Sequence, residues 1–283
     1  MTDFFYLQEI KAAIKKLGNS RLLYKNGITA LGGFTPYTSY EDMTSASFLS
    51  NSNKEIPIAI RFSGTFGPDG LSDTIRDIKA ASLRLYTEEG AFDIVAHSID
   101  LSDLDLKYIP QIITAFREFY NNKAFDDKYL WDLVKENPEQ LGIVIRFFSD
   151  ICTVKSYRFI NFYGINEYIL KNEYGIESIG KFIISPTDEA KTIDRKEAEF
   201  YAGFEPGIVT RDIIEAINNN NQCDFNLVFK TNSGELYSLG KLWLEEIADN
   251  DFNNKFYINP LNTVNGIELS RERDKLLAIA YCI

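Results

Sequence analysis

The 283-residue chain contains a single histidine, His97. A metal site built from several imidazoles is therefore excluded, and any histidine chemistry has to pass through this one residue. The three cysteines, Cys152, Cys223 and Cys282, are odd in number, widely spaced and form no Cys-x-x-Cys pair. They indicate neither a disulfide framework nor a zinc site, so reduced, structural thiols in a cytoplasmic protein are the expectation.

Positive charge and long apolar runs are also scarce. Lys and Arg number 30 against 41 Asp and Glu, which gives a formal net charge of -11. Nucleic acids and anionic membrane surfaces are disfavoured as partners, because both require clustered cations. No apolar run approaches the roughly 20 residues that cross a bilayer, and the first residues lack the basic start and apolar core of a signal peptide. We therefore expect a cytoplasmic protein with no membrane span and no nucleic-acid partner.

Aromatic residues, by contrast, are abundant, at 14% of the chain with 21 Phe and 16 Tyr. This content suits either an aromatic-rich core or a large flat ligand, and composition alone favours the core. The length and the apolar share of 45% allow a large core. Since no internal repeat and no linker composition is visible, we expect a single domain over residues 1–283, with an N-terminal helix within residues 1–20.

The hydrophobic patterns predict a mixture of strands and helices, which places the chain in the α+β class. A turn at Glu88-Glu89-Gly90 is expected to join two of the strands as a hairpin. The predicted strands cover residues 56–62, 81–87, 91–96, 181–185, 224–230 and 256–258. The predicted helices cover residues 108–122, 127–136, 138–148 and 210–217.

Several segments resemble the catalase superfamily. The strongest is Leu85–Val95, LYTEEGAFDIV, which is similar almost position by position to the family's FYTEEGNWDLV. Residues 60–63, IRFS, resemble the family's VRFS strand, and residues 21–27, RLLYKNG, resemble its RVVHARG segment. Residues 265–270, NGIELS, are similar to the PGIEPS that leads into the family's axial-tyrosine helix. The resemblance covers most of the chain.

The resemblance implies a catalase-like antiparallel β-barrel with flanking helices and haem b as the cofactor. Tyr281 falls within one residue of the proximal tyrosine, so it is the expected iron ligand. Arg21 and Arg61 are the expected partners of the haem propionates, because guanidinium pairs with carboxylate through two parallel hydrogen bonds. Tyr108 resembles the aromatic residue that lies over the porphyrin. The alternatives are ordinary surface or strand-end arginines, a core tyrosine for Tyr108 and a disordered terminal tyrosine for Tyr281.

The chain departs from the family pattern at the distal side. Tyr24 stands where the family has its distal histidine, and His97 stands where it has an asparagine. A phenol, with a pKa near 10, is a poor proton carrier at neutral pH, whereas an imidazole with its ordinary pKa near 6.5 can take that role. The resemblance implies that Ser63 faces Tyr24 or water. The alternative for His97 is a core histidine bonded to the backbone.

The proximal side departs as well, since Leu277 occupies the position of an arginine four residues before the axial tyrosine. The chain ends just after Tyr281, so we expect no C-terminal helical domain and no basis for bound NADPH. It resembles the short "mini-catalase" branch, which includes catalase-related peroxidases and allene oxide synthase.

The expected function is that of a haem-dependent oxidoreductase. It would use peroxide or an organic hydroperoxide to transform a small organic substrate, with weak classical catalase activity. Two alternatives stay open. One is a fatty-acid hydroperoxide dehydratase or isomerase of the allene oxide synthase kind, and the other is a non-catalytic haem-binding or haem-less protein. The sequence also leaves open whether the chain forms a homo-oligomer.

Overall fold

The computed structural model describes residues 8–10, 23–68, 70–101, 104–121, 125–221 and 223–281, without the side chains of residues 121, 277 and 279–281. The strands are β1 Gly27–Pro36, β2 Ile56–Gly64, β3 Lys79–Thr87, β4 Gly90–His97, β5 Phe162–Gly164, β6 Tyr168–Lys171, β7 Glu177–Pro186, β8 Asp224–Thr231, β9 Leu236–Ile247 and β10 Ile267–Leu269. The helices are α2 Ile109–Asn121, α3 Lys128–Glu136, α4 Leu141–Phe148, α5 Arg195–Phe204, α6 Ile208–Asn218, α7 Asn250–Lys255 and α8 Glu272–Tyr281. Of the predicted N-terminal helix, only Gln8–Ile10 lies within the described residues, and it is helical.

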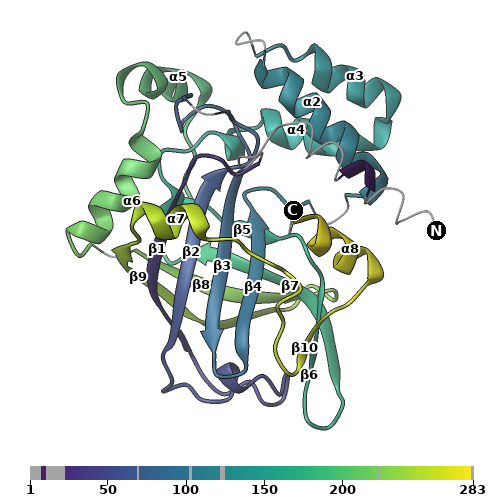
Figure 1. Ribbon diagram of the computed structural model, residues 1–283, viewed down its shortest axis with the longest axis vertical. Coiled ribbons are helices and arrows are strands. Elements are labelled where there is room, and N and C mark those ends of the chain that lie inside the picture. The colour runs from purple at the N-terminus through teal and green to yellow at the C-terminus, as the bar shows by residue number, and fades with distance from the viewer. Residues whose placement is uncertain are drawn as a thin grey trace.

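The strands form one antiparallel sheet in the order β10-β6-β7-β5-β4-β3-β2-β1-β9-β8. A further pairing of β7 with β8 closes eight of them into a barrel, which leaves β6 and β10 as an extension at its side (Figure 1). The helices α2, α3 and α4 lie together beyond one end of the barrel, and α7 lies against β1 (Figure 1). The predicted α+β class and the antiparallel barrel with flanking helices are confirmed.

The interior of the barrel is filled largely by aromatic side chains. The ring of Phe62 packs against those of Phe162 and Phe225, with centroids 5.7 and 5.6 Å apart, and Phe92 packs edge-on against Phe182 at 5.4 Å. All five side chains are fully buried. Much of the aromatic content therefore fills the core, where such pairs add to the free energy gained by burying apolar area. Because side chains alternate along a strand, the residues between these positions face outward from the barrel.

Two long strands, β1 and β9, were not predicted from the sequence. The pair Gly32-Gly33 weakens the strand pattern of β1, yet it is what lets β9 approach. A Cβ on Gly32 would lie 1.9 Å from the carbonyl oxygen of Trp243, and the β1–β9 register shifts at this point. Glycine inside a strand here marks a bulge with close backbone contact, which periodicity does not reveal.

The predicted strand at residues 256–258 is wrong, because these residues pair with no other strand. Backbone groups of this segment and of the neighbouring Asn259 form hydrogen bonds with side chains of the barrel strands instead. The carbonyl of Tyr257 accepts from Arg84, and the amide of Asn259 donates to the carboxylate of Asp93 at 2.8 Å. The segment is thus held by a buried ion pair and not by a ladder of strand hydrogen bonds.

That ion pair carries a stability prediction. Asp93 is fully buried, and both of its carboxylate oxygens accept from Arg84, at 2.7 and 2.6 Å. Since Asp93→Ala leaves the guanidinium of Arg84 without its carboxylate partner, we expect it to lower the free energy of unfolding by about 3–5 kcal/mol in urea titrations. The exposed pair Arg195–Glu199 supplies the control, because Glu199→Ala should change stability little. A loss for Asp93→Ala as small as that of the control would contradict this account.

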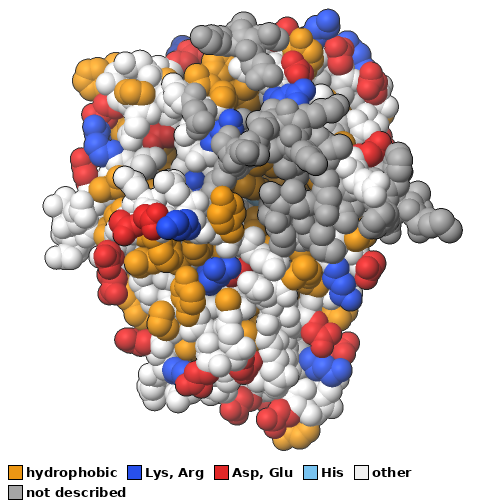
Figure 2. All heavy atoms as spheres, viewed as in Figure 1, with side chains coloured by type: hydrophobic (Ala, Val, Ile, Leu, Met, Phe, Trp, Pro, Cys, Tyr) orange, Lys and Arg blue, Asp and Glu red, His pale blue; other side chains and the backbone are white. Residues whose placement is uncertain are grey.

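On the surface, the described side chains of both charges are interspersed. Figure 2 shows Lys and Arg next to Asp and Glu over this face, without a continuous basic area among the coloured atoms. No helix in the described part of the chain combines the length and the apolar character needed to cross a membrane. Cys152 and Cys223 are free and buried, and burial raises the pKa of each thiol to about 12. As expected for structural thiols, both are far from the thiolate form at neutral pH.

Candidate functional site

His97 ends strand β4, where it pairs with Ala80 of β3 and Tyr163 of β5. The alternation along β4 sends Phe92, Ile94 and Ala96 into the barrel core, so His97 points to the outer side. Its neighbour on that side, Val95, belongs to the same buried hydrophobic cluster as Ile109 and Ile113 of α2. The imidazole therefore lies between the barrel wall and α2, and its side chain is buried.

The structure brings His97 and Tyr24 together. The hydroxyl of Tyr24 lies 2.8 Å from Nε2 of His97, a hydrogen-bond distance, and the two ring centroids are 5.8 Å apart. A neutral imidazole carries one proton, so either the phenol donates to Nε2 and Nδ1 carries the hydrogen, or Nε2 donates to the phenol oxygen and Nδ1 is a free acceptor. In both arrangements Nδ1 is the atom left for a further partner.

A small, mostly apolar cavity adjoins this pair. Its volume is about 80 Å³, room for two or three water-sized molecules. Two buried polar atoms, Nδ1 of His97 and Oγ1 of Thr65, have no hydrogen-bond partner among the described residues. Because such atoms cost free energy when left unpaired, their joint presence marks a place for a small polar ligand. The other lining residues are Ile10, Leu23, Tyr24, Phe66, Ile78, Leu101, Leu104, Ile109, Ile112, Ile113, Ile143 and Ile165.

Burial changes the acid–base character of His97. Desolvation lowers the pKa of its imidazole from 6.5 to about 3, because the charged form is excluded from water in an apolar setting. The expectation of a base with a pKa near neutrality is therefore corrected. At pH 7 the imidazole is neutral and serves as a hydrogen-bonding group and a weak base.

The backbone of Tyr24 is held in an unusual conformation. Its φ is 59°, the left-handed region that non-glycine residues rarely adopt and that commonly occurs at functional sites. The amide of Tyr24 donates to the carbonyl of Thr65 at 3.0 Å, and Nη1 of Arg61 donates to the carbonyl of Tyr24 at 2.9 Å. These bonds aim the phenol at His97.

Most N–H groups of the Arg61 guanidinium donate hydrogen bonds to other residues of the chain. Nη2 donates to the carbonyl of Lys25 at 3.1 Å, and Nε donates to Oδ1 of Asn253, in α7, at 3.3 Å. The side chain is buried and does not line the cavity. Its expected contact with a haem propionate stays a prediction, and the guanidinium meanwhile positions the backbone of Tyr24.

Ser63 and Tyr108 are not among the residues that line the His97 cavity. Ser63 is buried on β2, and Thr65 follows directly after this strand ends at Gly64. Thr65 was not predicted, yet it lines the cavity of His97. Its position two residues after Ser63 is the one signal that could have indicated it. Tyr108 lines a neighbouring hollow, where Nζ of Lys107 lies 4.4 Å from its ring centroid.

The remaining predicted site residues fall outside the description. Arg21 is not among the described residues, and of Tyr281 and Leu277 only the backbone is described, as part of α8. Their expected roles toward haem therefore stay predictions. The described residues supply the wall of the cavity beside His97, which includes Tyr24, Thr65 and the isoleucines of α2.

The family model described as Catalase matches residues 1–235 of the chain. Catalase-2 of Bacillus subtilis is 26% identical over 291 residues, which cover 98% of this chain and 41% of that protein. Catalase HPII of Pseudomonas putida is 29% identical, with 80% of this chain and 33% of that protein covered. Catalase isozyme 2 of Solanum tuberosum is 26% identical, with 98% and 61% covered. The chain thus spans less than two thirds of the length of each of these relatives.

Among solved structures, the crystal structure of a fungal catalase superposes with a TM-score of 0.84. It covers 96% of this chain and 60% of the fungal chain, at 23% sequence identity. At this level of identity the likeness shows the fold alone. The barrel and its flanking helices are therefore shared with catalases, and the chemistry has to be argued from the site.

Proposed function

Because the chain belongs to the catalase family, we propose that it is a haem-dependent oxidoreductase that uses peroxide or an organic hydroperoxide to transform a small organic substrate. The observation that carries the proposal is the Tyr24–His97 pair, with Nδ1 of the imidazole unpartnered and next to a small apolar cavity. A peroxide group offers both a donor and an acceptor, so it suits Nδ1 in either tautomer, and Oγ1 of Thr65 can bind its other oxygen.

The wall of the cavity beside His97 fits a peroxide in its chemistry. It is apolar apart from His97, Tyr24 and Thr65, so it excludes water and strengthens the hydrogen bonds of these groups. The cavity of about 80 Å³ accommodates a peroxide but is far below the ~300 Å³ at which ligand pockets begin. The porphyrin itself is proposed to be held by Tyr281 as the iron ligand, by Arg21 and Arg61 at the propionates, and by Tyr108. A bound haem would supply the redox-active iron needed to cleave the O–O bond.

In this proposal the protein's own residues handle the proton. In the tautomer in which Nε2 donates to the phenol oxygen of Tyr24, Nδ1 of His97 takes a proton from the bound peroxide and returns it. The hydrogen bond to Tyr24 keeps the ring in one orientation. Because the pKa of His97 is lowered to about 3, the imidazole is a weak base, and its protonated form is scarce at neutral pH. Rapid disproportionation of hydrogen peroxide is therefore expected to be weak, since acid–base catalysis is most efficient with a pKa near the working pH.

The test of this function is the haem spectrum. We expect the purified chain, supplied with haem, to show a Soret band, and Tyr281→Phe to lose it on desalting because a phenyl ring offers no ligand to iron. Tyr174→Phe is the matched control, since Tyr174 is 87% exposed and its substitution should leave the band unchanged. A wild-type protein without a Soret band under these conditions would exclude the haem-dependent function.

One observation favours the second candidate, a catalase-like protein that does not carry haem. The guanidinium of Arg61 donates to the carbonyls of Tyr24 and Lys25 and to Asn253, so it is held by three hydrogen bonds within the chain and without a propionate. The spectrum described above separates the two candidates.

The allene oxide synthase alternative gains no support from the cavity beside His97, which is too small for a fatty acyl chain. Loss of a hydroperoxide's diene absorbance without added reductant would nevertheless establish it.

The short branch of the family, the cytoplasmic location and the single-domain organisation stay predictions. Size-exclusion chromatography with light scattering answers the open question of a homo-oligomer.

A further inference from the structure

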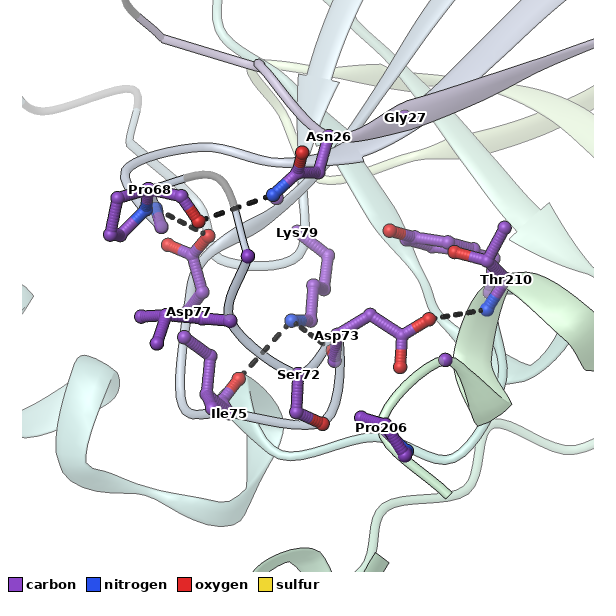
Figure 3. Close-up of a pocket in the computed structure, with 16 residues that line it drawn as sticks. Asn26, Gly27, Pro68, Ser72, Asp73, Ile75, Asp77, Lys79, Pro206 and Thr210 are labelled. Carbon is purple, nitrogen blue, oxygen red and sulfur yellow. Dashed lines mark hydrogen bonds between the residues drawn. The ribbon is translucent and has the colours of Figure 1, made fainter. Parts of the chain in front are cut away.

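A second cavity lies on the other side of the wall that carries Thr65. Its volume is about 320 Å³, and it is bounded by the connection between β2 and β3, the start of β1, Tyr157 and the residues that begin α6 (Figure 3). Gly64 and Asp77 line this cavity, whereas the next residues, Thr65 and Ile78, line the cavity of His97. The two cavities thus lie back to back across the same stretches of backbone, and they share no lining residue.

Lys79 places a buried cation in the second cavity. Its side chain is 2% exposed, and Nζ donates to the carbonyls of Asp73 and Ile75 at 2.8 and 3.2 Å (Figure 3). An ammonium group has three donors, so these two bonds leave one available. Burial lowers the pKa of Lys79, which shows how little water compensates its charge there.

Tyr157 adds a second donor to the same cavity. Its side chain is 2% exposed, and the ring stacks on Phe62 with centroids 5.4 Å apart. Its hydroxyl makes no hydrogen bond to the residues that the structure describes, and it is not among their buried unpaired polar atoms, so it is accessible from the cavity that Tyr157 lines. This group, like the third donor of Lys79, is therefore available to an acceptor that enters the cavity.

The charged groups around the cavity determine whether the site favours a neutral or an anionic ligand. Asp73 accepts from the amides of Val209 and Thr210, at the start of α6, and Asp77 accepts from those of Phe66 and Gly67. Burial is the main cause that raises the pKa of Tyr157, and the negative charges of Asp73 and Asp77 raise it further. Lys79 and Arg61, whose guanidinium lies against the lining residue Gly27, balance the two carboxylates. A site without net charge offers an anion no net attraction and suits a neutral ligand.

We propose that this cavity is a second binding site, which takes a small neutral hydroxycarbonyl compound. Its carbonyl oxygen accepts from Nζ of Lys79 and from the hydroxyl of Tyr157, and its hydroxyl donates to the carboxylate of Asp73, which Figure 3 shows facing the cavity beside Thr210. The volume corresponds to about ten water-sized molecules, enough for a compound of that size. The site is separate from the proposed peroxide chemistry and does not depend on haem.

The test uses hydroxyacetone as the probe, titrated into the full chain by ligand-observed NMR. We expect saturable binding to the wild type, and about tenfold weaker binding to Tyr157→Phe, which removes the hydroxyl and keeps the ring on Phe62. Tyr174→Phe, with an exposed tyrosine, is the matched control and should bind as the wild type does. Acetate, similar in size but anionic, should bind at least tenfold more weakly than hydroxyacetone.

Three results would overturn the proposal: no saturable binding of hydroxyacetone, equal affinity of Tyr157→Phe and wild type, or acetate binding as well as hydroxyacetone. Lys79→Met should also weaken binding by about tenfold. If this variant does not fold, because a buried lysine has been removed from its carbonyl partners, the comparison of Tyr157→Phe with Tyr174→Phe decides alone.

Discussion

His97→Ala is expected to lower the turnover of the haem-loaded protein with peroxide by about 10²-fold while the Soret band persists. The imidazole is the only group beside the cavity that can exchange a proton through a ring nitrogen, and positioned acid–base groups contribute about 10²–10⁴-fold to rates. The lower end applies here because burial lowers the pKa of His97 to about 3, which makes it a weak base. Steady-state kinetics with hydrogen peroxide and with an organic hydroperoxide measure the effect.

Tyr24→Phe is the matched variant for that experiment. It keeps an aromatic ring in place and removes only the hydroxyl that lies 2.8 Å from Nε2 of His97. Since Tyr24 orients the imidazole and does not exchange the proton with peroxide, we expect a smaller loss, about tenfold. Full activity of His97→Ala would show that the relocated imidazole has no part in the chemistry, whatever the spectrum shows.

The second large effect is a loss of stability in acid that depends on His97. The imidazole has a pKa of about 3 in the folded chain and 6.5 when exposed. Between these values the unfolded chain binds one more proton than the folded chain at this residue, so the free energy of unfolding falls as the pH falls. The slope from this one group approaches about 1.4 kcal/mol per pH unit within that window and vanishes above pH 6.5.

The measurement is urea unfolding of the wild type and of His97→Asn at a series of pH values from 7 to 4. Carboxylates titrate in both proteins, so the difference between the two curves isolates the imidazole. We expect the wild type to lose stability more steeply, and the difference to begin near pH 6.5. Parallel curves would mean that His97 is hydrated or paired in the folded state, contrary to its buried position between β4 and α2.

Part of the architecture could be read from the sequence because it rests on local patterns. The hairpin of β3 and β4 follows from alternating residues around the Glu88-Glu89-Gly90 turn, where Gly90 has the positive φ of 127° that glycine tolerates. The helices α2, α3 and α4 follow from apolar residues at helical spacing. The sequence patterns did not predict strands β1 and β9. Their pairing depends on a bulge at Gly32 that accommodates Trp243, a contact between residues more than 200 positions apart.

The sequence by itself determined the family, through the motifs at residues 60–63 and 85–95, and the exchange of residues at positions 24 and 97. It also determined that the chain has one imidazole. Only the tertiary structure decided that Tyr24 and His97 touch, that Thr65 and not Ser63 lines their cavity, and that Arg61 donates to the backbone of Tyr24. Burial and hydrogen-bond partners come from segments that are distant in the chain, and they move the pKa of His97 to about 3, which no local pattern can indicate.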